Sequence, residues 1–250
     1  MHNGDYSLVT VHARIVDKMY FFGKQRERYL KEREFIHKIV KLEDLGDELI
    51  DAGCGTGIHL MLFSELGYKV KGFDLRQDMV NVAKKRNSSL EIVQGDMREF
   101  PLNHKSDIII CMYGAINYLD TEEGIEKTFN NFYNHLKEKG GVIIDTRHYK
   151  NLDENIKIWT NPEYTLAKRW IKSKDNIGIY RVFYSIPSEG IMEMEDHLQY
   201  FQDPFLLKDK LRKVGFNDVK IFDNYEIDSF FTKNTQSYKP VIVGIKNKNG

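Results

Sequence analysis

A glycine-rich turn is the first stretch of the sequence whose residue types suggest chemistry. Residues 49–57 read Leu-Ile-Asp-Ala-Gly-Cys-Gly-Thr-Gly, and an apolar segment with helical spacing starts at Ile58. Glycine lets a backbone turn sharply and approach a ligand where a Cβ would collide. The helix predicted to follow offers free N–H groups in its first turn. A loop between a strand and a helix needs glycine for its own geometry as well, so the turn alone does not establish a ligand site.

Polar or special residues also follow the next three predicted strands. These strands are 69–74, 90–94 and 107–112, and the residues at or just after their carboxyl ends are Asp74, then Asp96 with Met97, then Tyr113 with Gly114. In a βαβ unit, an acid at the tip of the second strand faces the same crevice as the glycine turn and can accept hydrogen bonds from both hydroxyls of a ribose. Ligands of open α/β sheets bind at this carboxyl edge. The pattern therefore favours a ligand site there, with Asp74 as a ribose-binding acid.

The order and spacing of these motifs resemble the class I S-adenosylmethionine (SAM) dependent methyltransferases over roughly residues 48–146. Residues 51–57 look like the first motif of that family, Asp74 like its ribose-binding acid, and Gly95-Asp96-Met97 like its adenine-binding motif. The resemblance implies SAM as the cofactor and S-adenosylhomocysteine as its product. It also implies a set of cofactor-binding residues: Asp51, Gly53, Cys54, Gly55, Gly57, Asp74, Leu75, Met79, Asp96, Met97 and Met112. The competing class, a nicotinamide dehydrogenase, would place its third glycine one position after Gly57 and would lack the acid at position 51.

A helix is predicted over residues 24–42, where good helix formers place apolar side chains on one face. The other face carries the charges Arg26, Arg28, Lys31, Glu32, Arg33 and Glu34, a pattern typical of a solvated surface. An N-terminal helix that covers the cofactor is common in proteins resembling this one. Tyr20, Gly23 and Arg26 are therefore candidates for such a lid, because an arginine can pair with the carboxylate of SAM.

Composition limits the remaining possibilities. Thirty-seven basic and 37 acidic residues give a formal net charge of zero, which argues against affinity built on phosphate neutralisation. The two cysteines, Cys54 and Cys111, are interpreted as small buried or site-lining residues. No His, Cys and Asp cluster has metal-ligand spacing, so no metal is expected. The sequence has neither a membrane-length apolar run nor a signal-peptide pattern, and we expect a soluble, cytoplasmic protein.

Alternating strands and helices up to Asp145 predict an α/β fold with a doubly wound, mostly parallel, seven-stranded sheet. The pattern then changes to three predicted strands joined by short turns, which indicates an inserted antiparallel β-meander. The strands are 164–171, 177–185 and 191–201. A helix should follow, with Asp203 as its N-cap, Pro204 at its first position and Gly215 at its end. The predicted division is 1–46 as a helical lid, 47–149 and 203–250 as the SAM-binding domain, and 150–202 as the insert covering the substrate.

The methyl acceptor is expected near the ends of the fourth and fifth strands. The side chains there are Tyr113, Asn117, Tyr118, Arg147, His148 and Tyr149. Residues 144–149 resemble the I-D-x-R-x-Y stretch of the glycine and sarcosine N-methyltransferases, which implies that Arg147 binds an acceptor carboxylate. The alternative is an ion pair with Asp145 or Asp153. The asparagine that contacts the carboxylate in that family falls on Gly114 here, so glycine itself is in doubt as the substrate, and Asn117 is a candidate replacement.

Residues 95–119 also resemble the sugar-amine N,N-dimethyltransferases, through G-D-M-R and C-M-x-x-x-I-x-Y-L. Both relatives methylate small-molecule amines, so the predicted function is SAM-dependent methyl transfer to such an amine, with an amino acid or another carboxylate-bearing amine as one form of it. His148 is a candidate general base, because an imidazole ordinarily titrates near neutrality, and Tyr113 could direct its hydroxyl at the amine.

Three alternatives stay open. A methyltransferase of tRNA or protein would use a basic stripe formed by Lys168, Arg169, Lys172 and Lys174, although acids at 189, 193, 195 and 196 balance it. The protein could instead methylate a hydroxyl of a small molecule, or bind SAM without catalysis. The sequence does not determine the oligomeric state.

Overall fold

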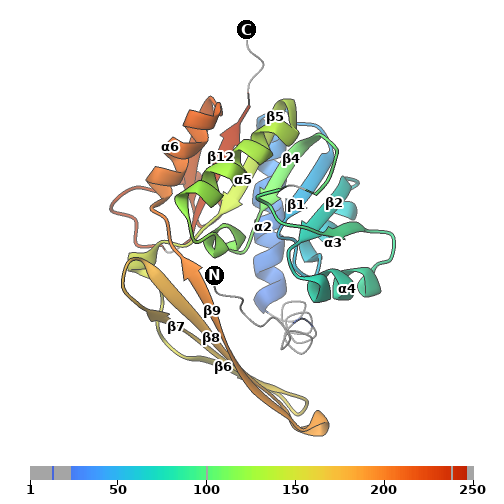
Figure 1. Ribbon diagram of the computed structural model, residues 1–250, viewed down its shortest axis with the longest axis vertical. Coiled ribbons are helices and arrows are strands. Elements are labelled where there is room, and N and C mark those ends of the chain that lie inside the picture. The colour runs from blue at the N-terminus through green and yellow to red at the C-terminus, as the bar shows by residue number, and fades with distance from the viewer. Residues whose placement is uncertain (1–12, 14–23, 100, 238, 247–250) are drawn as a thin grey trace.

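The computed structural model describes residues 13, 24–99, 101–237 and 239–246 (Figure 1). Its central sheet has eight strands in the order β11-β10-β12-β5-β4-β1-β2-β3. The strands are β1 (Glu48–Ala52), β2 (Lys69–Asp74), β3 (Glu91–Gln94), β4 (Ser106–Cys111), β5 (Leu136–Asp145), β10 (Asp218–Asp223), β11 (Glu226–Phe230) and β12 (Pro240–Ile245). Strands β1 to β5 are parallel, and β12, β10 and β11 add antiparallel neighbours at one end. This confirms the predicted doubly wound sheet, and β11 is one strand more than the seven expected.

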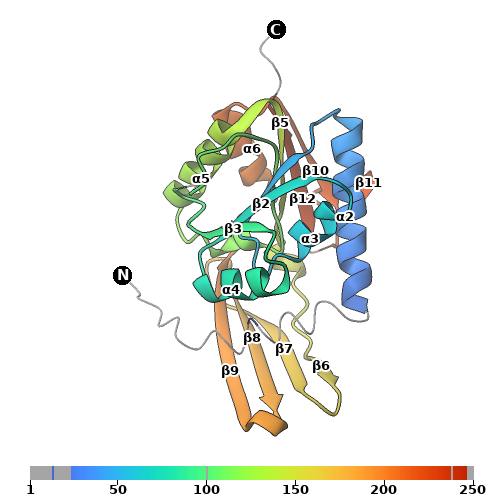
Figure 2. The ribbon, with the colours of Figure 1, turned by 90° about the vertical axis from the view of Figure 1, so that its right-hand side faces the viewer.

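Helices cover both faces of this sheet (Figure 2). They are α2 (Lys24–Leu42), α3 (Ile58–Ser64), α4 (Gln77–Arg86), α5 (Glu122–His135) and α6 (Pro204–Val214). Side chains of α2, α3 and α4 pack into one apolar core, and those of α5 and α6 into a second core on the other face. Strand β4 supplies both cores alternately, with Ile108 and Ile110 in the first and Ile109 in the second, as the two-residue period of a strand requires. Burial of each such side chain contributes roughly 1.5–3 kcal/mol.

The predicted helix boundaries are confirmed where capping residues mark them. Helix α6 starts at Pro204, and the Asp203 carboxylate accepts a hydrogen bond from the backbone N–H of Phe205 at 2.8 Å. Gly215 ends the helix with φ +123°, a value that favours glycine. Helix α2 has the predicted bounds. Tyr20 and Gly23, proposed for the lid, lie outside the described residues.

A second, antiparallel sheet projects from the body of the molecule (Figure 1). Its strands β6 (Lys157–Thr160), β7 (Thr165–Lys172), β8 (Ile177–Ile186) and β9 (Ile191–Tyr200) pair in chain order. The prediction of an antiparallel meander is confirmed, with four strands where three were expected. Strand β6 escaped prediction because it has four residues, three of them exposed, and hence no buried alternation. Its place at the edge comes from pairing with β7.

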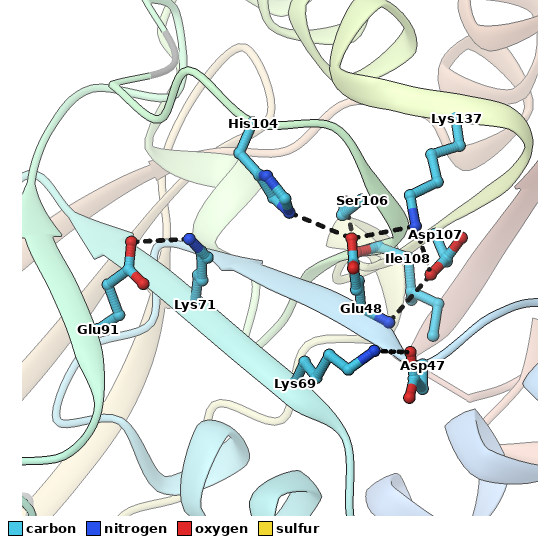
Figure 3. Close-up of polar contacts among 10 residues, drawn as sticks. All are labelled: Asp47, Glu48, Lys69, Lys71, Glu91, His104, Ser106, Asp107, Ile108 and Lys137. Atoms are coloured by element: carbon cyan, nitrogen blue, oxygen red, sulfur yellow. Dashed lines mark hydrogen bonds and ion pairs between the residues drawn. The ribbon is translucent and has the colours of Figure 1, made fainter.

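The amino-terminal edge of the parallel strands is closed by ion pairs (Figure 3). The Glu48 carboxylate lies 3.0 Å from Lys137 Nζ and 3.2 Å from His104 Nε2. The Asp107 carboxylate accepts hydrogen bonds from the Glu48 backbone N–H and from Lys137. The charges at this edge pair with one another, whereas Asp51, Asn117 and Gln199 at the opposite, carboxyl edge bury polar atoms that have no partner among the described residues.

Candidate active site

The glycine turn after β1 has the backbone conformation that its sequence predicts. Gly53, Gly55 and Gly57 have φ values of +79°, +54° and +75°. A Cβ on Gly53 would lie 2.9 Å from the Cβ of Ala115, so the turn packs closely against the 3-10 helix η2 (Ala115–Tyr118). A Cβ on Gly55 would meet nothing within 4 Å, so at that position it is the backbone conformation that favours glycine.

Asp51, at the end of β1, is a buried acid that lacks hydrogen-bond donors. Its side chain is 1% exposed, and neither carboxylate oxygen has a partner within the described part of the chain. Burial raises the pKa of Asp51 to about 7, against the attraction of His59. Buried polar groups of native proteins are nearly always hydrogen-bonded, so this carboxylate fits a ligand that brings a cation or an N–H donor. The ammonium group of SAM has this chemistry.

Asp74, at the tip of β2, is oriented by backbone donors. Gly55 N–H and Arg76 N–H donate to its two oxygens at 2.8 and 2.9 Å. Burial raises the pKa of Asp74 despite these bonds. Asp96, after β3, is bonded to the Arg98 backbone N–H and guanidinium, and Arg98 lowers its pKa although burial opposes this.

The remaining predicted cofactor residues surround the turn. The Met97 Cε lies 3.5 Å from the point where a Gly53 Cβ would stand. Met79 and Met112 are buried, Leu75 is half exposed, and Cys54 and Cys111 are buried free thiols. Among the side chains with described positions, no three His, Cys, Asp or Glu residues are grouped to hold a metal ion.

The structure places Arg28, rather than the predicted Arg26, beside the site. Arg26 is exposed, whereas the Arg28 guanidinium carbon lies 4.1 Å from the centroid of the Tyr113 ring. Two residues along an α-helix turn the side chain by roughly 200°, so only one of the two arginines can face the sheet. The Tyr29 ring stacks on Tyr113 at 5.5 Å between centroids. Helix α2 therefore delivers a cation to the carboxyl end of β4.

Glu32 is buried inside this interface, contrary to the prediction of a solvated face. Its carboxylate lies 2.6 Å from Arg28 Nε and 3.0 Å from His59 Nε2, which is on α3. Burial alone would raise the pKa of Glu32, but Arg28 and His59 outweigh it and lower the pKa to about 2. Burial alone would lower the pKa of His59, but the hydrogen bond to Glu32 outweighs burial and raises the pKa. The sequence held a signal for this, because Glu32 falls on the same stripe as the buried Tyr29 and Ile36.

A turn with unusual backbone follows β4. Tyr113 has φ +64°, a region that costs a side-chain-bearing residue about 1 kcal/mol or more, and Gly114 follows with φ +70°. The Gly114 backbone N–H donates to one oxygen of Asp145, and the Tyr225 hydroxyl donates to the other. Asp145 therefore holds this turn in place from the neighbouring strand β5.

Arg147 lies against the same turn. Its guanidinium carbon is 5.5 Å from the ring centroid of Trp170, on β7, and 6.0 Å from that of Tyr113. The acids considered as its ion-pair partners are engaged elsewhere. Asp145 bonds Gly114 and Tyr225, and Asp153 pairs with Lys157 at 2.9 Å.

Polar atoms of three elements converge on Gly114. A Cβ there would lie 3.0 Å from Asn117 Nδ2, 3.5 Å from Arg147 Nε and 3.7 Å from Gln199 Oε1. Asn117 was a candidate from the sequence. Gln199 was missed, because a glutamine near the end of an inserted strand carries no local signal of its position.

The other predicted acceptor residues lie apart from this cluster. The His148 ring packs edge-on against Phe231 at 5.5 Å, because successive residues of an extended chain point in opposite directions and Arg147 faces Trp170. The Tyr149 hydroxyl donates to the Ser173 carbonyl, and Tyr118 is half exposed.

Lys239 is a further residue, besides Gln199, that the sequence did not point to. Burial, with the charges of Arg28 and Arg147 adding to it, lowers the pKa of Lys239 to about 7.

Comparison with known proteins agrees with this geometry. Residues 49–140 match the model of a methyltransferase domain. The chain is 29% identical over 230 residues, 88% of each protein, to dTDP-3-amino-3,4,6-trideoxy-alpha-D-glucopyranose N,N-dimethyltransferase of Streptomyces venezuelae. It is 29% identical over 213 residues, 80% of this chain and 77% of the relative, to glycine/sarcosine N-methyltransferase of Aphanothece halophytica.

Solved structures share the fold. A SAM-dependent methyltransferase from Clostridium acetobutylicum superposes with a TM-score of 0.78 at 20% identity, covering 96% of this chain and 99% of the other. DesVI of Streptomyces venezuelae also gives 0.78, at 22% identity, with 94% and 98% covered.

Residues 49–140 carry the methyltransferase domain, and the motifs, the sheet and the buried Asp51 without hydrogen-bond donors agree with a SAM-dependent methyltransferase. SAM is its cofactor. No helix within the described ranges is long and apolar enough to cross a membrane.

Proposed function

We propose that this enzyme transfers a methyl group to the nitrogen of a small-molecule amine, and that an amine bearing a carboxylate fits the site best. The observation that carries the proposal is the group of Asn117, Arg147 and Gln199 around Gly114, at the end of β4 and beside Tyr113. A guanidinium and an amide N–H suit a carboxylate, and an amide oxygen suits an amine. The two relatives named above, a sugar-amine and a glycine/sarcosine N-methyltransferase, support an amine acceptor.

The residues that would hold SAM are Asp51, the glycine turn, Asp74, Asp96 with Met97, and Arg28. When bound, SAM supplies a methyl group on a positively charged sulfur. Transfer forms an N–CH₃ bond, breaks the S–CH₃ bond and releases one proton from the amine, with S-adenosylhomocysteine as the other product. The chain must therefore align the uncharged amine and exclude water. Alignment of this kind can supply about 7–11 kcal/mol of the barrier.

Helix α2 and the four-stranded sheet form borders of this site. Glu32, paired with Arg28 on α2, joins this helix to His59 on α3, and Trp170 and Gln199 reach the site from β7 and β9. We therefore assign residues 1–46 to a lid over the cofactor, 47–149 and 203–250 to the SAM-binding domain, and 150–202 to the cover of the acceptor. Tyr113, whose ring centroid lies 4.1 Å from the Arg28 guanidinium carbon and 6.0 Å from that of Arg147, is better placed than His148 to direct the amine.

The sheet argues against a macromolecular acceptor. Alternation along β7 puts Lys168 and Lys172 on the face opposite to Arg169, so these charges do not form one stripe. Lys168 lies over the rings of Trp159 and Tyr180, and Arg181 on β8 pairs with Asp196 at 2.7 Å. Nucleic acid would need a continuous basic surface. Transfer of the methyl group to a hydroxyl of a small molecule is the second candidate function.

Labelled SAM tests the proposal. The enzyme is incubated with methyl-labelled SAM and either a metabolite extract or total RNA and protein of the same cells, with Asp74→Ala as the control. We expect label on an amine in the small-molecule fraction, and much less with the control. Label confined to RNA or protein contradicts the proposal. Label on a hydroxyl of a small molecule would show O-methylation instead of N-methylation. No label, despite tight SAM binding, would favour a protein that binds SAM without catalysis.

A further inference from the structure

We infer that Gln199, at the root of the projecting sheet, determines acceptor specificity by binding the acceptor amine, while Asn117 and Arg147 bind the carboxylate of the same molecule. The acceptor would then be a compact amino acid with its amine and carboxylate close together. This inference rests on the proposed function, N-methylation of a small amine, and adds the class of acceptor and the residue that selects it.

The first support is that Gln199 and Asn117 each bury a polar atom without a partner. Gln199 is 3% exposed and its Oε1 accepts no hydrogen bond within the described ranges. Asn117 is 1% exposed. Its Oδ1 accepts a hydrogen bond from Thr146 Oγ1 at 2.7 Å, whereas its Nδ2 has no partner among the described residues. Each unmade bond costs about 1–3 kcal/mol, which a bound ligand would recover.

The second support is that these two atoms face one place. They lie 3.7 and 3.0 Å from the point where a Cβ of Gly114 would stand, and Arg147 Nε lies 3.5 Å from it. One acceptor, Gln199 Oε1, and one donor, Asn117 Nδ2, therefore lie near the same point, and neither has a partner among the described residues. A ligand that satisfies both must itself carry a donor and an acceptor a short distance apart. The Arg147 guanidinium beside them favours an anion as the hydrogen-bond acceptor of this ligand.

The third support is that aromatic packing holds Gln199 in position. Phe201, two residues further along the chain, fills the space of the missing side chain at Gly178, where a Cβ would lie 2.4 Å from a Phe201 ring carbon. Gly178 pairs with Gln199 across β8 and β9. The Phe201 ring lies 5.5 Å from Trp170, which also contacts Arg147. The projecting sheet therefore carries both Gln199 and Trp170, the residue that contacts Arg147, and Phe201 packs against Trp170 and Gly178.

The neutrality of Gln199 suits the chemistry. An amine must be uncharged to attack, and a carboxylate at position 199 would stabilise the ammonium form instead. An amide oxygen can accept an N–H hydrogen bond while favouring the charged form less. Gln199→Glu should therefore keep acceptor binding and slow the reaction, whereas Gln199→Leu should lose binding. This split separates a specificity role from a purely structural one.

The test measures acceptor binding to the enzyme saturated with S-adenosylhomocysteine. The calorimetric probes are the common α-amino acids and sarcosine, each with its decarboxylated amine and its hydroxy acid. We expect at least one amino acid to bind, with both analogues about tenfold weaker or more, the equivalent of one lost hydrogen bond to a charged group. Gln199→Leu should weaken that amino acid about tenfold and leave SAM affinity and the unfolding temperature unchanged. Gln202→Leu, the same change three residues later, serves as the matched control.

Kinetics with the same amino acid complete the test. Gln199→Glu should keep KM within about threefold, lower kcat about tenfold near neutral pH and move the optimum to higher pH. Wild-type affinity in Gln199→Leu overturns the role of Gln199. Binding and methylation of an amino sugar but of no amino acid overturns the acceptor class and leaves N-methylation standing. Label in RNA or protein alone would instead reject the proposed function itself.

Discussion

The backbone N–H of Gly55 donates a hydrogen bond of 2.8 Å to Asp74 Oδ2, which joins the glycine turn after β1 to the tip of β2. The other oxygen of Asp74 accepts from Arg76 N–H at 2.9 Å. Two backbone donors fix the carboxylate, and each oxygen keeps a lone pair for a further donor. The acid that should bind ribose is thus oriented before the cofactor arrives.

Removal of this carboxylate should weaken cofactor binding. Asp74→Ala deletes up to two hydrogen bonds to ribose hydroxyls, and we expect the SAM dissociation constant to rise about 10- to 100-fold. Calorimetric titration with SAM measures this, and circular dichroism checks the fold. Asp78→Ala, which removes the neighbouring partner of Arg76, should change the affinity little. Unchanged affinity in Asp74→Ala would exclude the ribose role.

The buried Asp51 should make SAM binding depend on pH. Because its pKa is raised to about 7, the free protein holds a proton on Asp51 below that pH. A cationic group of SAM favours the carboxylate, so binding should release a proton near pH 6, and SAM affinity should fall about fivefold as the pH drops from 7 to 6. Titration in two buffers of different ionisation enthalpy counts the protons. Asp51→Asn should abolish the release, and equal release by this variant would assign it to another group.

The Arg28–Glu32–His59 group should anchor α2. Glu32→Gln leaves the buried His59 and the partly buried Arg28 without their counter-charge, which we expect to cost about 3–5 kcal/mol of unfolding free energy in urea titrations. Glu34→Gln, on the exposed face where it pairs with Lys38, should cost less than about 1 kcal/mol. Equal effects of the two substitutions would mean that the buried group does not anchor the helix.

Glu32 should also make the free energy of unfolding depend on pH in acid. The pKa of Glu32 is about 2 in the folded protein, below its ordinary value of 4.5, so the unfolded chain binds more protons between these two pH values. Stability from Glu32 is therefore complete above pH 4.5 and is lost as the pH falls toward 2, on the order of 3 kcal/mol in all. Urea titrations at several pH values should show this dependence in the wild type and not in Glu32→Gln.

Arg147 should act on the acceptor and not on the cofactor. Arg147→Ala should raise the acceptor KM about 10- to 100-fold, the loss of a charge-assisted contact, with SAM affinity unchanged. Arg147→Lys keeps the charge but not the planar fork, so an intermediate KM is expected. If Arg147→Ala alters thermal stability while leaving KM unchanged, the arginine is structural and its stack on Trp170 is its role.

The sequence alone determined the sheet, the cofactor edge and most element boundaries. These features depend on local signals: the period of apolar residues, Asp203 and Gly215 as caps, and glycines at positive φ. Strands β6 and β11 lack such signals, since both are short and half exposed, and they form because neighbouring strands offer unpaired backbone groups.

Only the tertiary structure decided which side chains share the site. Glu32 and Gln199 are separated by most of the chain, and both are buried at the carboxyl edge of the sheet. Gln199 carries no local mark of burial, and Glu32 carries only its place on the apolar stripe of α2. The choice of Arg28 over Arg26 depends on the rotation of α2 about its axis, and the choice of Arg147 over His148 on the direction in which the chain leaves β5. Such choices follow from packing between distant segments, whose contacts local sequence patterns do not encode.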